Sequence, residues 1–474
     1  MNTKKIFIGL IALTLSMQSC REEYLNEPRP LSALTPDKVY SSLDNARSHI
    51  AGILRFSRNY HSGAETANIA SMYYARSVKG TDISLPTTAW FSGDYQYINR
   101  FANSDRPDFT WGLLYSLIRE TNAFITGMTE STKITDSDKR PLLAQAYTMR
   151  AWYYFELSQE FQQTYALDPS AFAPPIYTQS GLREGKPLST QKEMYDFILS
   201  DIEKALEYGT TERIDKSYYN KTVTYALATR VYQVLAGNTN NATYWNKIKE
   251  YANLAYGGSV ENALDASSYG SGFDEMKNTE WILALPQTED QSITWAMPPY
   301  GFLGAEWYDG WIAENLVGKF SNTDVRRLFY EDLGNQGKFR TSKFKYSNSA
   351  NVALVRTPEM ILAEAEAYYH LGNETSAHNL LYQLQVNRDP SAVKSSNTGN
   401  ALLEEILLER RKELYGEIGV EWFDAKRLQR GIKRDNTHSV TIDIAPNDKR
   451  FYMQIPQAEI DANKNISKTI NVGR

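Results

Sequence analysis

Cysteine, histidine and runs of basic residues are scarce in this sequence. Cys20 is the only cysteine, so a disulfide within the chain is excluded. The five histidines are scattered, and lone histidines are usually structural or exposed. The net charge is −5 and no long basic run occurs, which argues against nucleic acid as a partner.

Familiar catalytic motifs are also missing. The chain contains no G-x-x-x-x-G-K-[ST], no strand-led G-x-G-x-x-G, no H-E-x-x-H and no G-x-S-x-G. Glu306 and Asp309 offer two carboxylates for a glycosidase, but a three-residue spacing in a loop fixes no separation between them. Asn322 to Asp324 could offer oxygen ligands to a structural calcium ion, yet no ligand loop is recognisable. We therefore predict a protein that is not an enzyme and has no cofactor or metal.

After its first twenty residues the chain has no apolar run long enough to span a membrane. At the front, Lys4 and Lys5 precede an apolar stretch over 6–15, and Cys20 lies where a lipoprotein signal peptidase would cleave. We predict a signal peptide over 1–19 and a lipid-anchored tether over 20–36, with Cys20 as the lipidated residue. Arg21-Glu22-Glu23 resembles the tag that sends such lipoproteins to the outer cell surface.

Helical periodicity dominates the rest of the chain. Apolar residues recur at three- and four-residue spacing over 39–55, 107–128, 141–161, 194–206, 222–236, 245–256, 358–371 and 376–386. Pro141 is expected in the first turn of its helix, where proline is favoured. Two helices joined by Gly372-Asn373, with alanines at the crossing, are typical of a tetratricopeptide-like pair.

Between 257 and 351 the helical pattern fails, and a short strand is predicted over 280–285. The predicted fold is mainly α, with tetratricopeptide-like helical pairs and an irregular, loop-rich lobe with a few short strands. Its parts are an N-terminal helical part over 37–256 and a C-terminal part over 257–474, in one compact unit. The C-terminal part contains the irregular insertion 257–351.

The stretch 409–431, ERRKELYGEIGVEWFDAKRLQRG, is the most distinctive of the sequence. It begins in an amphipathic helix, breaks at Gly416 and Gly419, and resumes in an aromatic-led helix from about Glu421. By composition alone it is an ion-paired, solvated helix face. The order of its residues, however, resembles the C-terminal signature of the SusD/RagB family of surface nutrient-binding lipoproteins, although Ile418 stands where the family usually has a small residue.

Two further segments carry the same resemblance, 356–365 (RTPEMILAEA) and 455–460 (IPQAEI). It implies a SusD-like fold and a glycan-binding lipoprotein exposed on the outer membrane. Such a protein captures an oligo- or polysaccharide and delivers it to a SusC-like TonB-dependent transporter. A peptide-binding importer subunit of the same family, a surface glycoside hydrolase and a protein-only tetratricopeptide scaffold remain as alternatives.

Tyrosine and tryptophan are abundant, with 32 and 9 residues, and six aromatics gather in the glycine- and proline-rich stretch 295–311. Flat aromatic faces stack on sugar rings, whereas a loop that buries its own rings would be a small satellite core. An earlier non-helical segment, 72–97, is the other half of the ligand surface implied by the resemblance. We predict stacking platforms at Trp90, Tyr300, Trp307 and Trp311, and partners for ligand hydroxyls at Arg76 and Asp94.

Overall fold

The computed structural model describes residues 36–271, 273, 275–287, 300–304, 310–335, 337–345 and 350–474, and the mainly α fold is confirmed. The helices are α3 (Pro36–Val39), α4 (Leu43–Arg58), α5 (Ile69–Ser77), α6 (Ser92–Tyr95), α7 (Asp105–Glu130), α8 (Asp136–Phe161), α9 (Gln191–Tyr208), α10 (Lys221–Ala236), α11 (Ala242–Tyr256), α12 (Tyr300–Leu303), α13 (Glu314–Val317), α14 (Thr357–His370), α15 (Glu374–Arg388), α16 (Asn400–Leu414), α17 (Val420–Arg427) and α18 (Gln457–Ala462). Short 3-10 turns lie at η1 (Val260–Asn262), η2 (Tyr269–Ser271) and η5 (Lys449–Phe451). Cys20, the predicted lipidation site, lies outside the described residues.

The strands are short and pair only antiparallel. They are β1 (Ile83–Ser84), β2 (Phe172–Ala173), β3 (Ser189–Thr190), β4 (Trp281–Leu285), β5 (Trp311–Ile312), β6 (Phe329–Glu331), β7 (Phe339–Thr341), β8 (Val352–Arg356), β9 (Ile432–Arg434) and β10 (Ile442–Ile444). One sheet has the order β1-β5-β7-β6, and β2–β3, β4–β8 and β9–β10 form pairs. The strand predicted over 280–285 is confirmed as β4, which is buried along its whole length.

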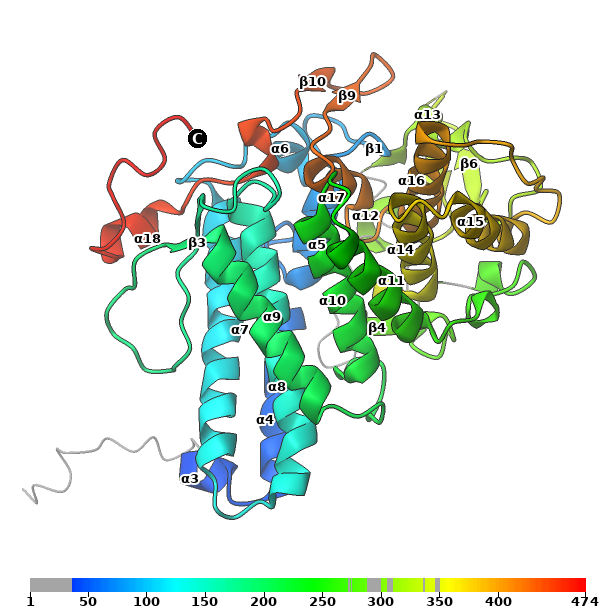
Figure 1. Ribbon diagram of the computed structural model, residues 1–474. Helices are drawn as coiled ribbons and strands as arrows, with labels where there is room; N and C mark the ends of the chain where they lie inside the picture. The colour runs from blue at the N-terminus through cyan, green and yellow to red at the C-terminus, as the bar shows by residue number, and fades with distance from the viewer. Residues whose placement is uncertain are drawn as a thin grey trace, which may run out of the picture.

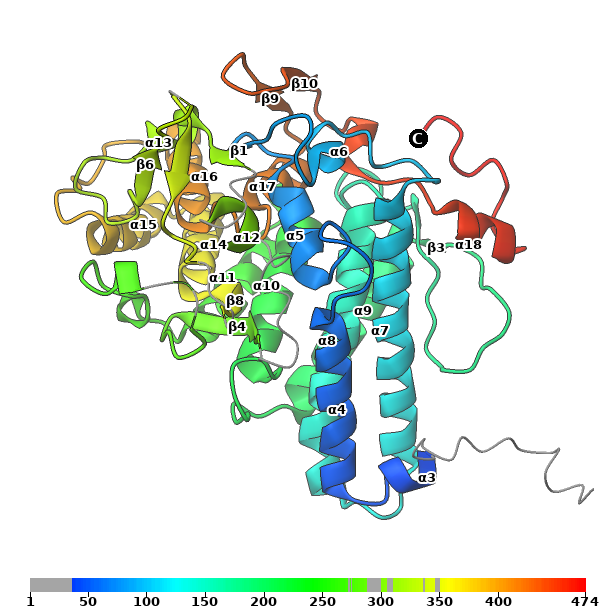
Figure 2. The ribbon, with the colours of Figure 1, turned by 180° about the vertical axis from the view of Figure 1, so that it is seen from behind.

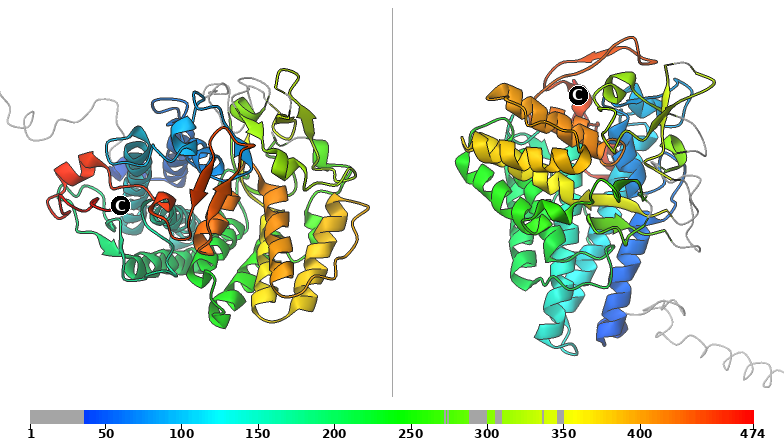
Figure 3. Two further views of the ribbon diagram at one scale, coloured as in Figure 1. Left: turned by 90° about the horizontal axis from the view of Figure 1, so that it is seen from above. Right: turned by 90° about the vertical axis from the view of Figure 1, so that its right-hand side faces the viewer.

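The long helices form two groups that share one hydrophobic core. Helices α4, α7, α8 and α9 run side by side down one half of the molecule (Figure 1, and from behind in Figure 2). Helices α10, α11, α14, α15 and α16 pack in succession in the other half, and the right view of Figure 3 shows α11, α14 and α16 as layers. Successive antiparallel helices that bury their faces on one another are the predicted tetratricopeptide-like arrangement. Among the helices of the described ranges, none is long and apolar enough to cross a membrane.

Helix α8 begins earlier than the proline pattern predicts. The helix starts at Asp136, and the Thr135 hydroxyl accepts a hydrogen bond from the Asp138 N–H at 3.3 Å. Pro141 therefore lies inside the helix and not in its first turn. The Thr135 cap satisfies a free N–H at the helix start, and the acidic residues that follow it interact favourably with the positive end of the helix dipole. Together they stabilise a helix start at Asp136, upstream of the proline.

The two glycines of the 409–431 stretch make the predicted break between α16 and α17. Gly416 and Gly419 have φ of 75° and 69°, a left-handed conformation that glycine adopts without steric cost. A Cβ on Gly419 would lie 2.3 Å from the Cβ of Arg76 on α5. The turn therefore brings α17 directly against α5, as only a glycine allows.

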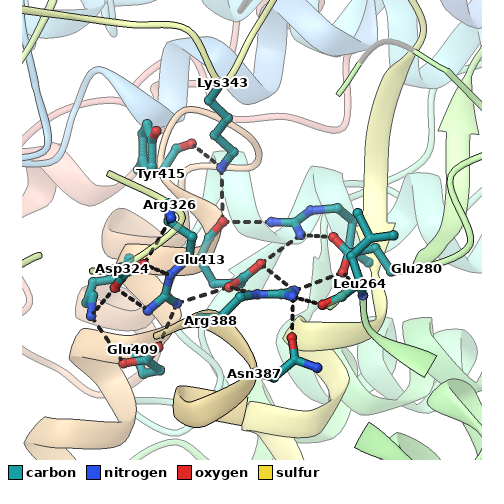
Figure 4. A network of polar contacts seen from close by, with 12 residues as sticks. Leu264, Glu280, Asp324, Arg326, Lys343, Asn387, Arg388, Glu409, Glu413 and Tyr415 are labelled. Carbon is teal, nitrogen blue, oxygen red and sulfur yellow. Dashed lines mark hydrogen bonds and ion pairs between the residues drawn. The ribbon is translucent and has the colours of Figure 1, made fainter. Parts of the chain in front are cut away.

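The charged residues of the same stretch are buried, so its interpretation as a solvated helix face is wrong. Glu413 is fully buried and accepts hydrogen bonds from Arg326, Arg356 and Arg388 at 2.9–3.1 Å (Figure 4). Glu417 accepts from Arg356 and from the Lys343 ammonium, both at 2.6 Å. We call these six residues the Glu413 cluster.

Electrostatics in the Glu413 cluster favour the charged forms. Burial alone raises the pKa of Glu413, but the three arginines more than offset this and hold the pKa well below its usual range. The pKa of Glu417 is also lowered, because Arg356 and Lys343 outweigh its desolvation. Strand β8, helices α15 and α16, and the segment that follows β7 are thereby joined at one point in the interior.

Asp324, near which a calcium ion was considered from the sequence, lies beside this cluster. Its carboxylate accepts from Arg326 at 2.8–2.9 Å and pairs with Lys412 at 2.8 Å. Its charge is thus paired with two cations of the protein. In the described parts of the chain no cluster of three acidic, histidine or cysteine side chains could hold a metal.

Candidate functional site

The early loop that connects α5 with α7 turns one aromatic ring inward and the next one outward. Phe91 has a φ of 62°, a conformation that is unusual for a residue with a side chain. Its buried ring packs on Tyr74 and Phe302, with centroid distances of 4.9 and 5.3 Å. Trp90, directly before it, is 48% exposed. The strained residue anchors the loop and leaves the indole at the surface.

The early and late loops predicted to form one surface do meet. Strands β1 and β5 pair antiparallel, with Ser84 opposite Trp311 and Ile83 opposite Ile312. The rings of Tyr74 and Phe302 stack 5.7 Å apart. Segments more than two hundred residues apart in the sequence are therefore fixed to one another by buried contacts.

Trp90 borders a surface hollow of about 690 Å³, which we call the Trp90 hollow. Its polar lining comes from three segments: Ser62, Glu65 and Thr66; Ser92 and Asn99; and Asp105 and Asp108 at the start of α7. Phe109 adds a second, half-buried ring. Among the described lining residues there are three carboxylates and no lysine or arginine. The volume is that of a small-molecule site.

Glu65 is the most constrained of the three carboxylates. It accepts a hydrogen bond from the backbone N–H of Phe91, which ties the hollow to the strained residue. Burial raises the pKa of Glu65 above its usual range, and the nearby charges of Asp94 and Asp105 raise it further. The Phe91 N–H and Arg106 act in the opposite direction without cancelling the shift.

Arg76 and Asp94 lie beneath this surface and not on it. They are 3% and 2% exposed. Arg76 is bound to Glu156 and Glu160 on α8, and Asp94 accepts from Arg106 at 2.9–3.1 Å. Both side chains hold the early loop onto the helices. This corrects their prediction as partners for ligand hydroxyls, because a ligand at the surface does not reach them.

The late-loop aromatics have different positions. Trp311 is partly exposed, and its indole N–H donates to the Asp332 carboxylate at 2.9 Å. This hydrogen bond is the main reason why the pKa of Asp332 falls to about 2. The cations of Lys338 and Arg340 lie 5.5 and 5.2 Å from the Trp311 ring centre. The ring is thus fixed, and protein cations already contact it.

Two other predicted platforms are outside what the structure describes. Tyr300 begins α12, but its side chain is not among the described ones, and Trp307 lies between the described ranges 300–304 and 310–335. The catalytic alternative at Glu306 and Asp309 falls in the same gap.

Sequence reasoning missed most of the lining of the Trp90 hollow. Glu65, Asp105 and Asp108 come from segments with no aromatic cluster and no motif. The acidic first turn of α7 was visible as a helix-start pattern, but such a pattern does not reveal a neighbouring cavity. Only the fold places these residues around Trp90.

Comparison with known proteins agrees with this architecture. A family model described as "Starch-binding associating with outer membrane" matches residues 47–233, and the model of the SusD family matches residues 207–473. SusD-like protein P38 of Formosa agariphila is 25% identical, over 91% of this chain and 92% of its own length.

Solved structures show the same fold. A SusD-like carbohydrate binding protein from Bacteroides vulgatus superposes with a TM-score of 0.79 at 25% identity, covering 90% of this chain and 98% of that one. A SusD superfamily protein from Bacteroides thetaiotaomicron gives a TM-score of 0.77 at 23% identity, covering 90% and 99%. The SusD family model alone matches more than half of the sequence, and the chain therefore belongs to the SusD family, as the 409–431 signature predicts.

Proposed function

We propose that this member of the SusD family is a glycan-binding surface protein that captures an oligo- or polysaccharide in the Trp90 hollow. The half-exposed indole of Trp90, held at the rim by the buried Phe91, is the observation that carries the proposal. A sugar ring can lay its C–H face on the indole while its hydroxyls bond to the polar lining. Carbohydrate binding by the Bacteroides vulgatus relative and the starch-binding description of the family model support this assignment.

Within the site, Trp90 is the principal platform. Tyr300 and Trp307 are proposed as further platforms on the late loop, whose strand β5 pairs with β1 of the early loop. Trp311 is proposed as a weaker platform, because Lys338 and Arg340 already lie against its ring. Carboxylate oxygens of Glu65, Asp105 and Asp108 accept hydrogen bonds from sugar hydroxyls.

Capture and hand-over, without bond cleavage, make up the proposed mechanism. The protein is held at the outer membrane through a lipid on Cys20 and delivers its ligand to a SusC-like TonB-dependent transporter. The description of the matched family model, which associates it with the outer membrane, supports this location. Modest affinity suits the role, because an open hollow buries little ligand surface and the ligand must leave again.

The test is calorimetric titration of the chain from Cys20 onward with a panel of soluble oligosaccharides. Trp90→Ala should weaken binding to the selected glycan about tenfold, the effect of one lost stacking contact. Tyr330→Ala is the matched control, since Tyr330 on β6 is 46% exposed and does not line the Trp90 hollow. Equal binding by Trp90→Ala and the parent protein would remove the site from this hollow. Release of shortened products during titration would establish a hydrolase instead.

A peptide ligand is the second candidate, and the charge of the Trp90 hollow favours it. Three carboxylates without a lining lysine or arginine, among the described residues, suit a basic peptide as well as a neutral sugar. Titration with lysine- and arginine-rich peptides in the same experiment separates the two. Saturable peptide binding that falls in Glu65→Gln, with no glycan bound, would favour the peptide importer.

A further inference from the structure

A second hollow, of about 450 Å³, lies on the other half of the molecule and shares no residue with the Trp90 hollow. Its walls come from the α9–α10 loop, from the first residues of α10 and α14, from the C-terminal end of α11 with the η1 turn that follows it, and from β4, which lies beside α10 in Figure 1. The volume falls within the range of small-molecule sites and exceeds the need of a bare ion.

Two cations from the α9–α10 loop line this hollow, and each is bound to backbone carbonyl oxygens. Arg213 donates to the carbonyl oxygen of Ile282 at 2.7 Å, and the Lys216 ammonium donates to the carbonyl oxygen of Asn278. Within the described ranges, neither side chain forms an ion pair with a carboxylate. Burial, with repulsion from Arg213, lowers the pKa of Lys216 to about 8, and desolvation also lowers the pKa of Arg213.

Trp281 on β4 supplies a donor without an acceptor. The residue lines the hollow and is 1% exposed, and its indole N–H has no hydrogen-bond partner among the described residues. Buried donors in native proteins are nearly always paired, because an unpaired one loses its hydration without compensation. An acceptor atom in the hollow would satisfy it.

Two helix N-termini meet the same space. Thr222 belongs to the first turn of α10, which has 16 residues, and Thr357 is the first residue of α14, which has 14 residues. The N-terminus of α14 has no side-chain cap. The Thr357 N–H is already bound to the carbonyl oxygen of Glu280 at 2.8 Å, and the C-terminal end of α11 also lines the hollow. The helix ends therefore add little net positive potential, and the two cations and the Trp281 N–H are the main attraction for an anion.

Three carboxylates lie near the hollow. Asp215 acts on Arg213 through its charge, and its carboxylate accepts hydrogen bonds from the N–H and hydroxyl of Ser217. Glu261 is exposed at the edge of the hollow. The carboxylate of Glu280 is bound to Arg356 at 2.6 Å and to Arg388 at 2.8 Å, so it is already neutralised. From these observations we propose that this hollow binds the carboxylate, sulfate or phosphate group of a small molecule, held by Arg213, Lys216 and the Trp281 N–H.

Calorimetric titration with sodium sulfate, inorganic phosphate and glucuronate, with glucose as the neutral probe, tests the site. The parent protein should bind at least one of the three anions and not glucose. Lys216→Met and Arg213→Gln should each weaken anion binding about tenfold or more, as expected for a lost charge-assisted hydrogen bond. Lys204→Met, an exposed lysine on α9, is the matched control and should leave the affinity unchanged.

Trp281→Phe keeps an aromatic ring but removes the N–H donor together with the five-membered ring, so it should lower the affinity several-fold. An unchanged circular dichroism spectrum would show that the fold tolerates the smaller side chain at this buried position. Arg213→Lys should recover part of the binding lost in Arg213→Gln. Preference for glucuronate over both inorganic anions would identify an acidic sugar, and equal binding would identify the oxyanion alone as the ligand. No anion binding by the parent protein, or an equal loss in Lys204→Met, would overturn the proposal. Trp90→Ala should keep anion binding, which separates this site from the glycan site.

Discussion

Carboxylates in two regions of this protein have opposite surroundings. In the interior, Glu413 is bound by three arginines, and its pKa lies well below the usual range. At the surface, Glu65 lies in a hollow with two further carboxylates and no lysine or arginine among the described lining, and its pKa is raised. The interior carboxylate therefore has all its interactions within the protein. The Glu65 carboxylate at the surface can still interact with a positive charge or accept further hydrogen bonds from a ligand.

Removing one arginine from the Glu413 cluster should have the largest effect. Arg356→Met leaves Glu280, Glu413 and Glu417 buried with too few cations, and such a loss costs about 3–5 kcal/mol of unfolding free energy. Urea denaturation followed by circular dichroism measures it. Arg430→Met is the control, because its pair with Glu404 is exposed and should be worth at most about 1 kcal/mol. Similar losses in both variants would show that burial does not distinguish the two pairs.

Acid should act on the same cluster. The folded-state pKa values of Glu413 and Glu417 are lowered, so both groups stabilise the fold fully above the unfolded value of about 4.3. This stability is lost as the pH falls below about 4.3 toward the folded-state values. Urea midpoints measured from pH 7 to pH 3 should therefore fall steeply below that point. Glu413→Gln should start from a lower stability and show a flatter decline, and an unchanged slope would contradict the assignment.

The fold was predictable because its patterns are local. Helical periodicity gave the long helices to within a few residues, and Gly416 and Gly419 marked the turn between α16 and α17. Burial of charge was not predictable, because a charged helix has the same sequence pattern whether its charged side chains face water or arginines from distant parts of the chain. For the same reason Arg76 and Asp94 could not be recognised as interior residues.

The candidate site was predictable only in part. The order of aromatic residues indicated the early and late loops, and the β1–β5 pair confirms that they meet. The lining of the Trp90 hollow depends on three segments that come together only in the folded chain. No sequence pattern predicts the left-handed backbone conformation of Phe91. The packing of its ring on Tyr74 and Phe302, which only the folded chain provides, accompanies this conformation.

Trp90→Ala should separate binding from stability. The indole is about half exposed, so its loss should change the unfolding free energy by no more than about 0.5 kcal/mol. Glycan affinity should nevertheless fall about tenfold, as argued for the stacking contact. Thermal unfolding of the variant beside Tyr330→Ala, together with the titrations, tests this. A marked loss of stability would mean that Trp90 supports the loop and would weaken its assignment as a platform.

The smallest effect is expected for Glu65→Gln, and its sign is the sharpest test of the comparison. Since the folded state raises the pKa of Glu65, its charged form is disfavoured, and stability is lost as the pH rises through the folded value. The amide keeps the same size and can still accept the hydrogen bond from Phe91, but it carries no charge.

At pH 7 the Glu65→Gln variant should therefore be as stable as the parent or more stable, by less than about 1 kcal/mol. Below about pH 4.3 the difference should vanish, because the carboxyl is then protonated in both states. Asp108→Asn, at an exposed carboxylate of the same hollow in the first turn of α7, should lower the stability by no more than about 1 kcal/mol, because it removes a charge that interacts favourably with the helix dipole. Urea midpoints at pH 7 and pH 3.5 test this prediction. If Glu65→Gln destabilised the protein as much as Glu413→Gln, both carboxylates would stabilise the fold. Glu65 would then not be a charge that is available to a ligand.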